Sequence, residues 1–84
     1  MNDVQNFQRS LERSLLIHRW NPTTTEIIRI ARLFARSESK DQGHLISLVT
    51  EVCPSTIFMI NEGGDNSDLR TLVAMAIQVA KSNR

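Results

Sequence analysis

The amino-acid sequence predicts an all-α fold, a compact bundle of about five helices that forms a single helical domain over residues 1–84. A chain of 84 residues is long enough for one hydrophobic core and too short for two. Aromatic residues make up 5% of the chain, tyrosine is absent, and there are only three glycines and two prolines, fewer than the strands and turns of a β-sandwich usually contain. Apolar residues recur instead at helical spacing along most of the chain.

The first predicted helix runs from about Asp3 to Trp20. Its apolar side chains and one histidine recur every three or four residues and form one stripe: Val4, Phe7, Leu11, Leu15 and His18. Asn21 precedes Pro22, and a residue before proline is disfavoured in the helical region, so the helix ends there. Other apolar side chains near this end lie off the stripe, and we expect them to form a dimer interface with two side chains of the last helix. The expected interface residues are Leu16, Ile17, Trp20, Met75 and Val79.

A second helix is predicted from Thr23 to about Ser37. Thr23 and Glu26 have the spacing of a capping box, in which a hydroxyl and a carboxylate each accept a hydrogen bond from a backbone amide at the helix start. Apolar residues cover most of the circumference of this helix. The narrow stripe that remains carries three arginines, Arg29, Arg32 and Arg36.

Further helices are predicted from about Asp41 and, as a short segment, over Pro54–Asn61, because proline is favourable at a first helical position. The alternative for Thr56–Ile60 is a short buried strand, which periodicity over five residues does not exclude. No other segment offers an obvious pairing partner for such a strand, so the sequence favours the helix. A glycine-containing turn over residues 62–66 precedes the last helix, predicted from about Ser67 to Lys81.

Charge and cysteine content narrow the classes of function. The formal net charge of +1 is too close to zero to indicate a nucleic-acid or membrane partner by itself. This net charge is the sum of two opposite contributions. Residues 1–40 are basic, with seven Lys/Arg against four Asp/Glu, and residues 41–84 are acidic, with three Lys/Arg against five Asp/Glu. The single cysteine excludes an intramolecular disulfide, and the N-terminal apolar run is too short for a signal peptide or a membrane span. We therefore expect a cytoplasmic protein without membrane contact.

Catalytic and metal-binding chemistry is poorly supported. Cys53, His44 and His18 are the best candidates for a nucleophile and a base, and no spacing connects them. One cysteine and two dispersed histidines do not supply the three or four ligands that zinc needs. We therefore expect no enzyme activity, no cofactor and no metal.

A motif in the second half of the chain carries the most information about function. Ser47 and Glu51 occupy the small and turn positions of a helix-turn-helix, and the sequence continues as Ser55-Thr56-Ile57-x-x-Ile60-x-x-Gly63-x-x-Asn66-x-x-Leu69-x-Thr71-Leu72. From roughly Gln42 to Val79 this pattern resembles the lambda-repressor-like helix-turn-helix family. Two positions depart from the family pattern: Glu51 stands where glycine is common, and Cys53 replaces the usual Ser or Thr cap.

The resemblance implies a small, non-catalytic regulator that binds double-stranded DNA as a homodimer. Its recognition helix directs Ile57 and Ile60 into the core and turns other residues toward base edges. These outward residues are Pro54, Ser55, Thr56, Phe58 and Met59. The expected phosphate contacts are Arg29, Arg32, Arg36, Lys40 and Gln42.

A second function stays open at this point. The outward face of the predicted recognition helix lacks the Arg, Gln or Asn that reads a base through two hydrogen bonds, and it offers Phe58 and Met59 instead. Large apolar side chains on a surface also suit a protein contact. The alternative is a helix-turn-helix-derived interaction module, such as an antitoxin, antirepressor or inhibitor, that no longer binds DNA.

Overall fold

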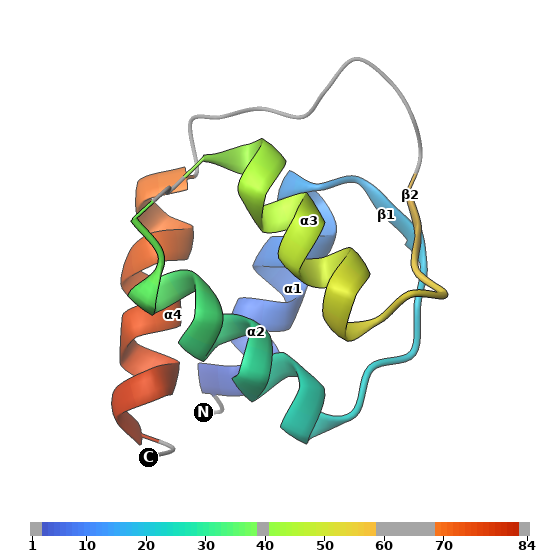
Figure 1. The fold of residues 1–84 in the computed structure, drawn as a ribbon. Helices are drawn as coiled ribbons and strands as arrows, with labels where there is room; N and C mark the ends of the chain where they lie inside the picture. Colours follow the sequence, from blue (N-terminus) through green and yellow to red (C-terminus); the bar gives the residue numbers. More distant parts are fainter. Residues whose placement is uncertain (1–2, 39–40, 59–68, 83–84) are drawn as a thin grey trace.

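Four helices and a small antiparallel sheet make up the part of the chain that the computed structural model describes, residues 3–38, 41–58 and 69–82. In chain order the elements are α1 (Asp3–Ser14), β1 (Ile17–Arg19), α2 (Thr24–Arg36), α3 (Gln42–Val52), β2 (Ile57–Phe58) and α4 (Leu69–Ser82) (Figure 1). The protein is therefore mostly helical, as predicted. The predicted turn over residues 62–66 and the start of the last helix at Ser67 lie outside the described residues.

Helix α1 ends at Ser14, well before the predicted end at Trp20. The amide of Leu15 still donates to the Leu11 carbonyl at 2.9 Å, but Leu16 has φ 53°, in the left-handed region, and the chain leaves the helix there. A left-handed conformation costs a leucine roughly 1–2 kcal/mol. Burial of Leu15, which is only 4% exposed, offsets part of that cost. The helix prediction is wrong beyond this turn, because the apolar residues that follow belong to a strand.

The strands β1 and β2 pair antiparallel, with Ile17 opposite Phe58 and Arg19 opposite Ile57, and with an irregularity in register between the two pairs. The short helix predicted over Pro54–Asn61 is therefore wrong for its described residues, 54–58. The strand alternative holds for Ile57–Phe58. Its pairing partner is the segment that the sequence pattern assigned to the end of the first helix.

Helix α2 begins with the predicted capping box. The amide of Glu26 donates to Thr23 Oγ1 at 3.1 Å, and the amide of Thr23 donates to Glu26 Oε1 at 2.8 Å. The helix ends at Arg36, with Ser37 as its C-cap, in agreement with the predicted boundary. Its apolar face is fully buried and consists of Ile27, Ile30, Ala31 and Phe34.

Helix α3 begins where predicted, with Asp41 as its N-cap accepting a hydrogen bond from the His44 amide at 2.7 Å. It continues through Glu51 to Val52, so the tight turn predicted at Glu51 is not present. Cys53 follows as the C-cap, and its amide donates to the Val49 carbonyl at 2.7 Å. The helix-turn-helix predicted for this region is therefore not present in that register, because the turn after α3 leads into β2.

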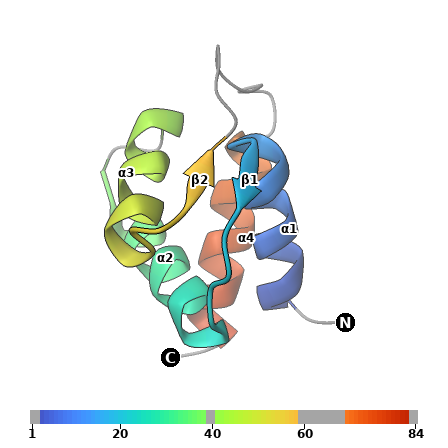
Figure 2. The same ribbon diagram turned by 90° about the vertical axis from the view of Figure 1, so that its right-hand side faces the viewer.

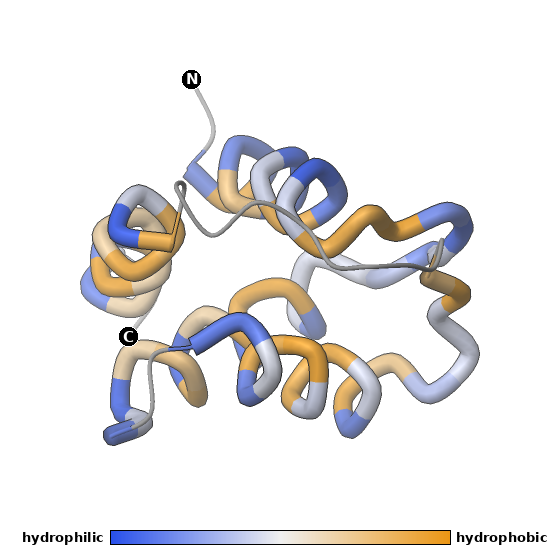
Figure 3. Tube along the Cα trace, turned by 90° about the horizontal axis from the view of Figure 1, so that it is seen from above, coloured by the Kyte–Doolittle hydropathy of each residue, from blue (hydrophilic) through white to orange (hydrophobic). Residues whose placement is uncertain are grey.

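The helices enclose one core, with α2 at its centre in contact with the other three. Helices α2 and α3 form one layer and α1 lies opposite, with β1 and β2 side by side between them (Figure 2). Hydrophobic positions of the two layers face each other and hydrophilic positions face outward (Figure 3). Each helix contributes fully buried residues, among them Phe7, Leu11, Phe34, Leu45 and Leu72. Val79 of α4, expected at a dimer interface, is also fully buried and belongs to this core.

The capping box gives a direct test of helix α2. Thr23→Ala removes the hydroxyl that accepts from Glu26 and leaves a backbone amide without its cap. We expect the free energy of unfolding to fall by about 1 kcal/mol in urea denaturation. Thr25→Ala, an exposed threonine of the same helix, is the matched control and should change stability by less than about 0.5 kcal/mol. Equal losses in the two variants would contradict a capping role for Thr23.

Candidate nucleic-acid interface

A line of three exposed arginines runs along the outer face of α2. Arg29, Arg32 and Arg36 are spaced three and four residues apart, so they share one face of the helix, opposite its buried apolar residues. The sequence predicted this stripe, and its exposure is as expected. Glu26, the acidic residue of this helix, is partly buried and engaged in the capping box.

The exposed residues of helix α3 are uncharged except for Glu51, which lies four residues after Ser47 on the same face of the helix. Gly43, Ser47 and Thr50 are exposed and lie three and four residues apart. Ser47 Oγ donates to the Gly43 carbonyl at 3.2 Å. A Cβ placed on Gly43 would meet only the Asp41 carboxylate, at 3.5 Å, so the backbone at the start of α3 is open to close approach. The sequence prediction placed the base-reading face at residues 54–59 and did not include these residues of α3.

Two other predicted phosphate contacts do not join this face. Gln42 Nε2 donates to the Ser14 carbonyl at 2.9 Å, so its side chain links the start of α3 to the end of α1. The last carbonyls of a helix have no partner within the helix, and Gln42 satisfies one of them. Lys40 lies outside the described residues.

Exposed acidic residues follow the arginine line in the chain. Glu38 follows α2, Asp41 caps α3, and Glu51 lies in the last turn of α3, and all three are exposed. They reduce the positive potential at the edges of the layer, while the middle of α2 carries only arginines on its outer face. The exposed positive charge of this layer is therefore concentrated along α2.

The residues predicted to read DNA bases lie in and after the turn that follows α3. Pro54 and Ser55 are exposed, while the Thr56 hydroxyl donates to the Cys53 carbonyl at 2.8 Å. Ile57, predicted to point inward, is 50% exposed, and Phe58, predicted to point outward, packs against the core. The two orientations are exchanged relative to the helix prediction, because successive side chains of a strand point to opposite sides. Met59 and Ile60 lie outside the described residues.

The strand pairing also creates a hollow of about 290 Å³ at the end of β1, which the sequence did not indicate. It is lined by Arg19, Trp20, Asn21, Ser55 and Ile57. Trp20 is held by a hydrogen bond from its Nε1 to Glu12 Oε2 at 2.8 Å, and Gln8 Nε2 donates to the same oxygen at 3.3 Å. The residues that meet here are far apart in the sequence, so only the antiparallel pairing brings them together.

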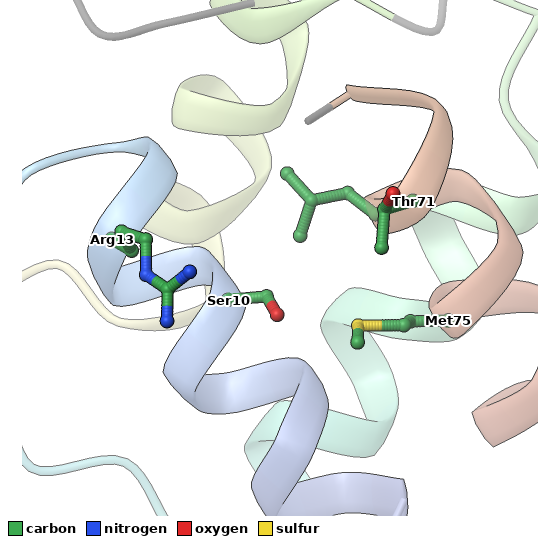
Figure 4. A pocket seen from close by; sticks show the side chains of 5 residues that line it. Ser10, Arg13, Thr71 and Met75 are labelled. Atoms are coloured by element: carbon green, nitrogen blue, oxygen red, sulfur yellow. The ribbon is translucent and has the colours of Figure 1, made fainter. Parts of the chain in front are cut away.

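The residues predicted to form a dimer interface mostly pack within the chain. Ile17 and Trp20 lie against the core, and Leu16 is partly buried in the turn after α1. Met75 projects between α4 and α1, where it lines a hollow of about 280 Å³ together with Ser10, Arg13, Thr71 and Leu72 (Figure 4). An adjoining smaller hollow is lined by Asp3, Asn6, Met75 and Gln78.

Cys53 is a buried thiol with reduced reactivity. Burial raises the pKa of Cys53 above the ordinary 9.0, and the nearby Glu26 carboxylate raises it further through its charge and through a hydrogen bond. A raised pKa disfavours the thiolate, which is the nucleophilic form. Over residues 3–38, 41–58 and 69–82, no three His, Cys, Asp or Glu side chains are grouped so that they could hold a metal ion.

Comparison of the chain with protein-family models, with curated proteins and with solved structures finds no match. Within the described part of the chain, no helix combines the length and the apolar character needed to cross a membrane.

The raised pKa of Cys53 predicts a loss of stability in alkali. The unfolded thiol ionises near 9.0 and the folded thiol only at higher pH, so the unfolded state binds fewer protons between the two values. The contribution of Cys53 to stability is therefore complete below pH 9 and falls as the pH rises through the folded pKa. We expect urea denaturation to show a steeper alkaline decrease for the wild type than for Cys53→Ala. Parallel pH profiles of the two proteins would contradict this assignment.

The hydrogen bond between Trp20 and Glu12 predicts a difference between two substitutions. Glu12→Ala removes the acceptor of the indole N–H, and we expect the free energy of unfolding to fall by about 1 kcal/mol. Glu12→Gln keeps a side-chain oxygen at the same position and should lose less than half of that. Urea denaturation followed by the emission of the single tryptophan measures both. A loss as large in Glu12→Gln would mean that the charge, and not the hydrogen bond, matters.

Proposed function

We propose that this protein is a small, non-catalytic DNA-binding protein that contacts the duplex through the outer face of the α2–α3 layer. The observation that carries the proposal is the line of Arg29, Arg32 and Arg36, exposed on the outer face of α2. Arginine suits phosphate binding because its planar guanidinium donates two parallel hydrogen bonds to one phosphate group.

The arrangement of α2 and α3 supports this mode of binding. Two helices joined by a short connection, residues 37–41, form one layer with their outer faces on the same side (Figures 2 and 3). In a helix-turn-helix, the first helix crosses the phosphate backbone and the second enters the major groove. In the proposed mode of binding, α2 takes the role of the first helix and α3 that of the second.

The length of the arginine line agrees with the spacing of phosphates. From Arg29 to Arg36 the helix rises by about 10 Å. One strand of the duplex places a phosphate about every 3.4 Å along the axis, so the line spans about three phosphates. Contacts of this type determine position and affinity and carry no direct information about sequence.

The outer face of α3 is suited to weak base discrimination. The Thr50 hydroxyl can donate to or accept from several bases, and its methyl can contact a thymine methyl, whereas Ser47, whose hydroxyl donates to the Gly43 carbonyl, can accept. No long amide or guanidinium side chain on the outer face of α3 offers a bidentate base contact in the described residues. We expect affinity dominated by phosphates, in the range of roughly 10⁻⁴–10⁻⁶ M at physiological salt.

The protein-interaction module is the second candidate function, and one observation favours it. Ile57 is 50% exposed on β2, and it is one of two large apolar side chains exposed in the described part of the chain. Phe58, on which that alternative first relied, packs against the core and contributes little surface. We therefore rank duplex binding above protein interaction as the function. We propose that the protein is cytoplasmic and that its homodimer interface does not include Val79, since this side chain is fully buried in the core.

The duplex-binding proposal is tested by fluorescence anisotropy with a labelled random-sequence DNA duplex at several salt concentrations. The double variant Arg29→Gln with Arg36→Gln should bind more weakly, and the slope of log affinity against log salt should become shallower by about 2. The control is Arg9→Gln with Arg70→Gln, which removes the same charge from exposed positions on α1 and α4. No binding by the wild type at low salt, or equal losses in the two double variants, would overturn the proposal.

A further inference from the structure

We propose that the hollow at the end of β1 is a binding site for one nucleotide unit, a phosphate together with its base. Its lining residues are Arg19, Trp20, Asn21, Ser55 and Ile57. This inference rests on a different surface from the duplex contact of α2 and is independent of it.

The site is assembled by the pairing of the two strands. Arg19 lies opposite Ile57 in the antiparallel pair, and the segments that flank this pair bring Asn21 and Ser55 to the same hollow. The turn that carries Ser55 is closed by hydrogen bonds from the amide and hydroxyl of Thr56 to the Cys53 carbonyl, at 3.1 and 2.8 Å. The strand pairing and this turn therefore hold the backbone that carries the polar side chains in position before a ligand arrives, which lowers the entropic cost of binding.

The polar lining consists of hydrogen-bond donors suited to a phosphate. The Arg19 guanidinium, the Asn21 amide and the Ser55 hydroxyl can all donate, and none of the described residues that line the hollow is acidic. Within the described ranges none of these three side chains is engaged in a hydrogen bond or an ion pair. A guanidinium with two neutral donors beside it favours an anion with several acceptor oxygens.

The apolar lining suits the base of the same nucleotide. Trp20 is partly exposed, and its indole is fixed by the hydrogen bond to Glu12 at 2.8 Å, so it offers a rigid wall. Ile57 is one of two large hydrophobic side chains exposed in the described part of the chain, and a flat ring in the hollow would cover it. Aromatic side chains are the usual stacking platform for single nucleobases.

The volume of the hollow limits the size of the ligand. About 290 Å³ is just below the range of small-molecule pockets, about 300–1,000 Å³. The hollow therefore accommodates one nucleotide and not a dinucleotide cofactor. The nucleotide has two sources, a free mononucleotide or one residue of a single strand, and the chemistry of recognition is the same for both.

The single tryptophan of the chain lines the hollow and reports on it directly. We would titrate the protein with a purine nucleoside 5′-monophosphate, the same nucleoside without phosphate, inorganic phosphate and a short single-stranded oligonucleotide, and follow Trp20 emission. We expect saturable quenching by the monophosphate or by the oligonucleotide, and affinities at least about tenfold weaker for nucleoside and phosphate alone. Tighter binding of the oligonucleotide assigns the site to a strand, and equal or weaker binding assigns it to the free nucleotide.

A pair of arginine variants tests whether the quenching comes from this hollow. Arg19→Gln should weaken binding at least about tenfold, while Arg9→Gln, an exposed arginine on α1, should leave it unchanged. Circular dichroism checks that both variants are folded. Absence of saturable quenching by both nucleotide ligands, or equal behaviour of the two variants, overturns the proposal. Duplex binding by α2 is measured separately, so either proposal can fail without the other.

Discussion

The antiparallel pairing of β1 with β2 is the contact on which the arrangement of this small fold depends. It joins the segment between α1 and α2 to the segment after α3, two stretches of chain separated by the whole α2–α3 layer. The pairing requires α1 to stop at Ser14 and Leu16 to take a left-handed conformation. It also turns Phe58 onto the core and leaves Ile57 on the surface. A two-stranded ribbon is marginal by itself, so its stability comes from packing on the helices beside it.

Helix α2 is the element that connects the core to the proposed function. One face carries Ile27, Ile30 and Phe34, which are fully buried against the other helices, and the opposite face carries the exposed arginines. The capping box determines where the helix starts and therefore which residues fall on each face. The orientation of the arginine line relative to α3 follows from the packing of the apolar face, since a helix cannot rotate without exposing it.

The two candidate sites, the arginine stripe and the hollow around Trp20, differ in how far the sequence could predict them. The arginine stripe was predictable because helical periodicity alone places three residues on one face. The hollow around Trp20 was not, because its lining comes from two segments whose proximity depends on strand pairing. The wrong helix prediction at residues 54–58 has the same origin. Five residues are too few to distinguish a helix from a strand by periodicity. The strand that pairs with this segment, β1, lies in a stretch whose own pattern was compatible with a helix. Gln42 shows a related effect. Its long polar side chain suits a phosphate contact when the sequence is considered alone, but in the fold it donates a hydrogen bond to the Ser14 carbonyl at the end of α1.

The sequence by itself determined the mostly helical class, the start and end of α2, the start of α3 and the exposed arginine line, because each depends on local spacing and on capping over a few neighbouring residues. Tertiary structure decided where α1 stops, that residues 57–58 form a strand, that Val79 is core, and which polar side chains meet at the hollow. These features depend on contacts between residues distant in the chain. Short segments adopt whichever conformation buries their apolar side chains and satisfies their backbone groups in that environment.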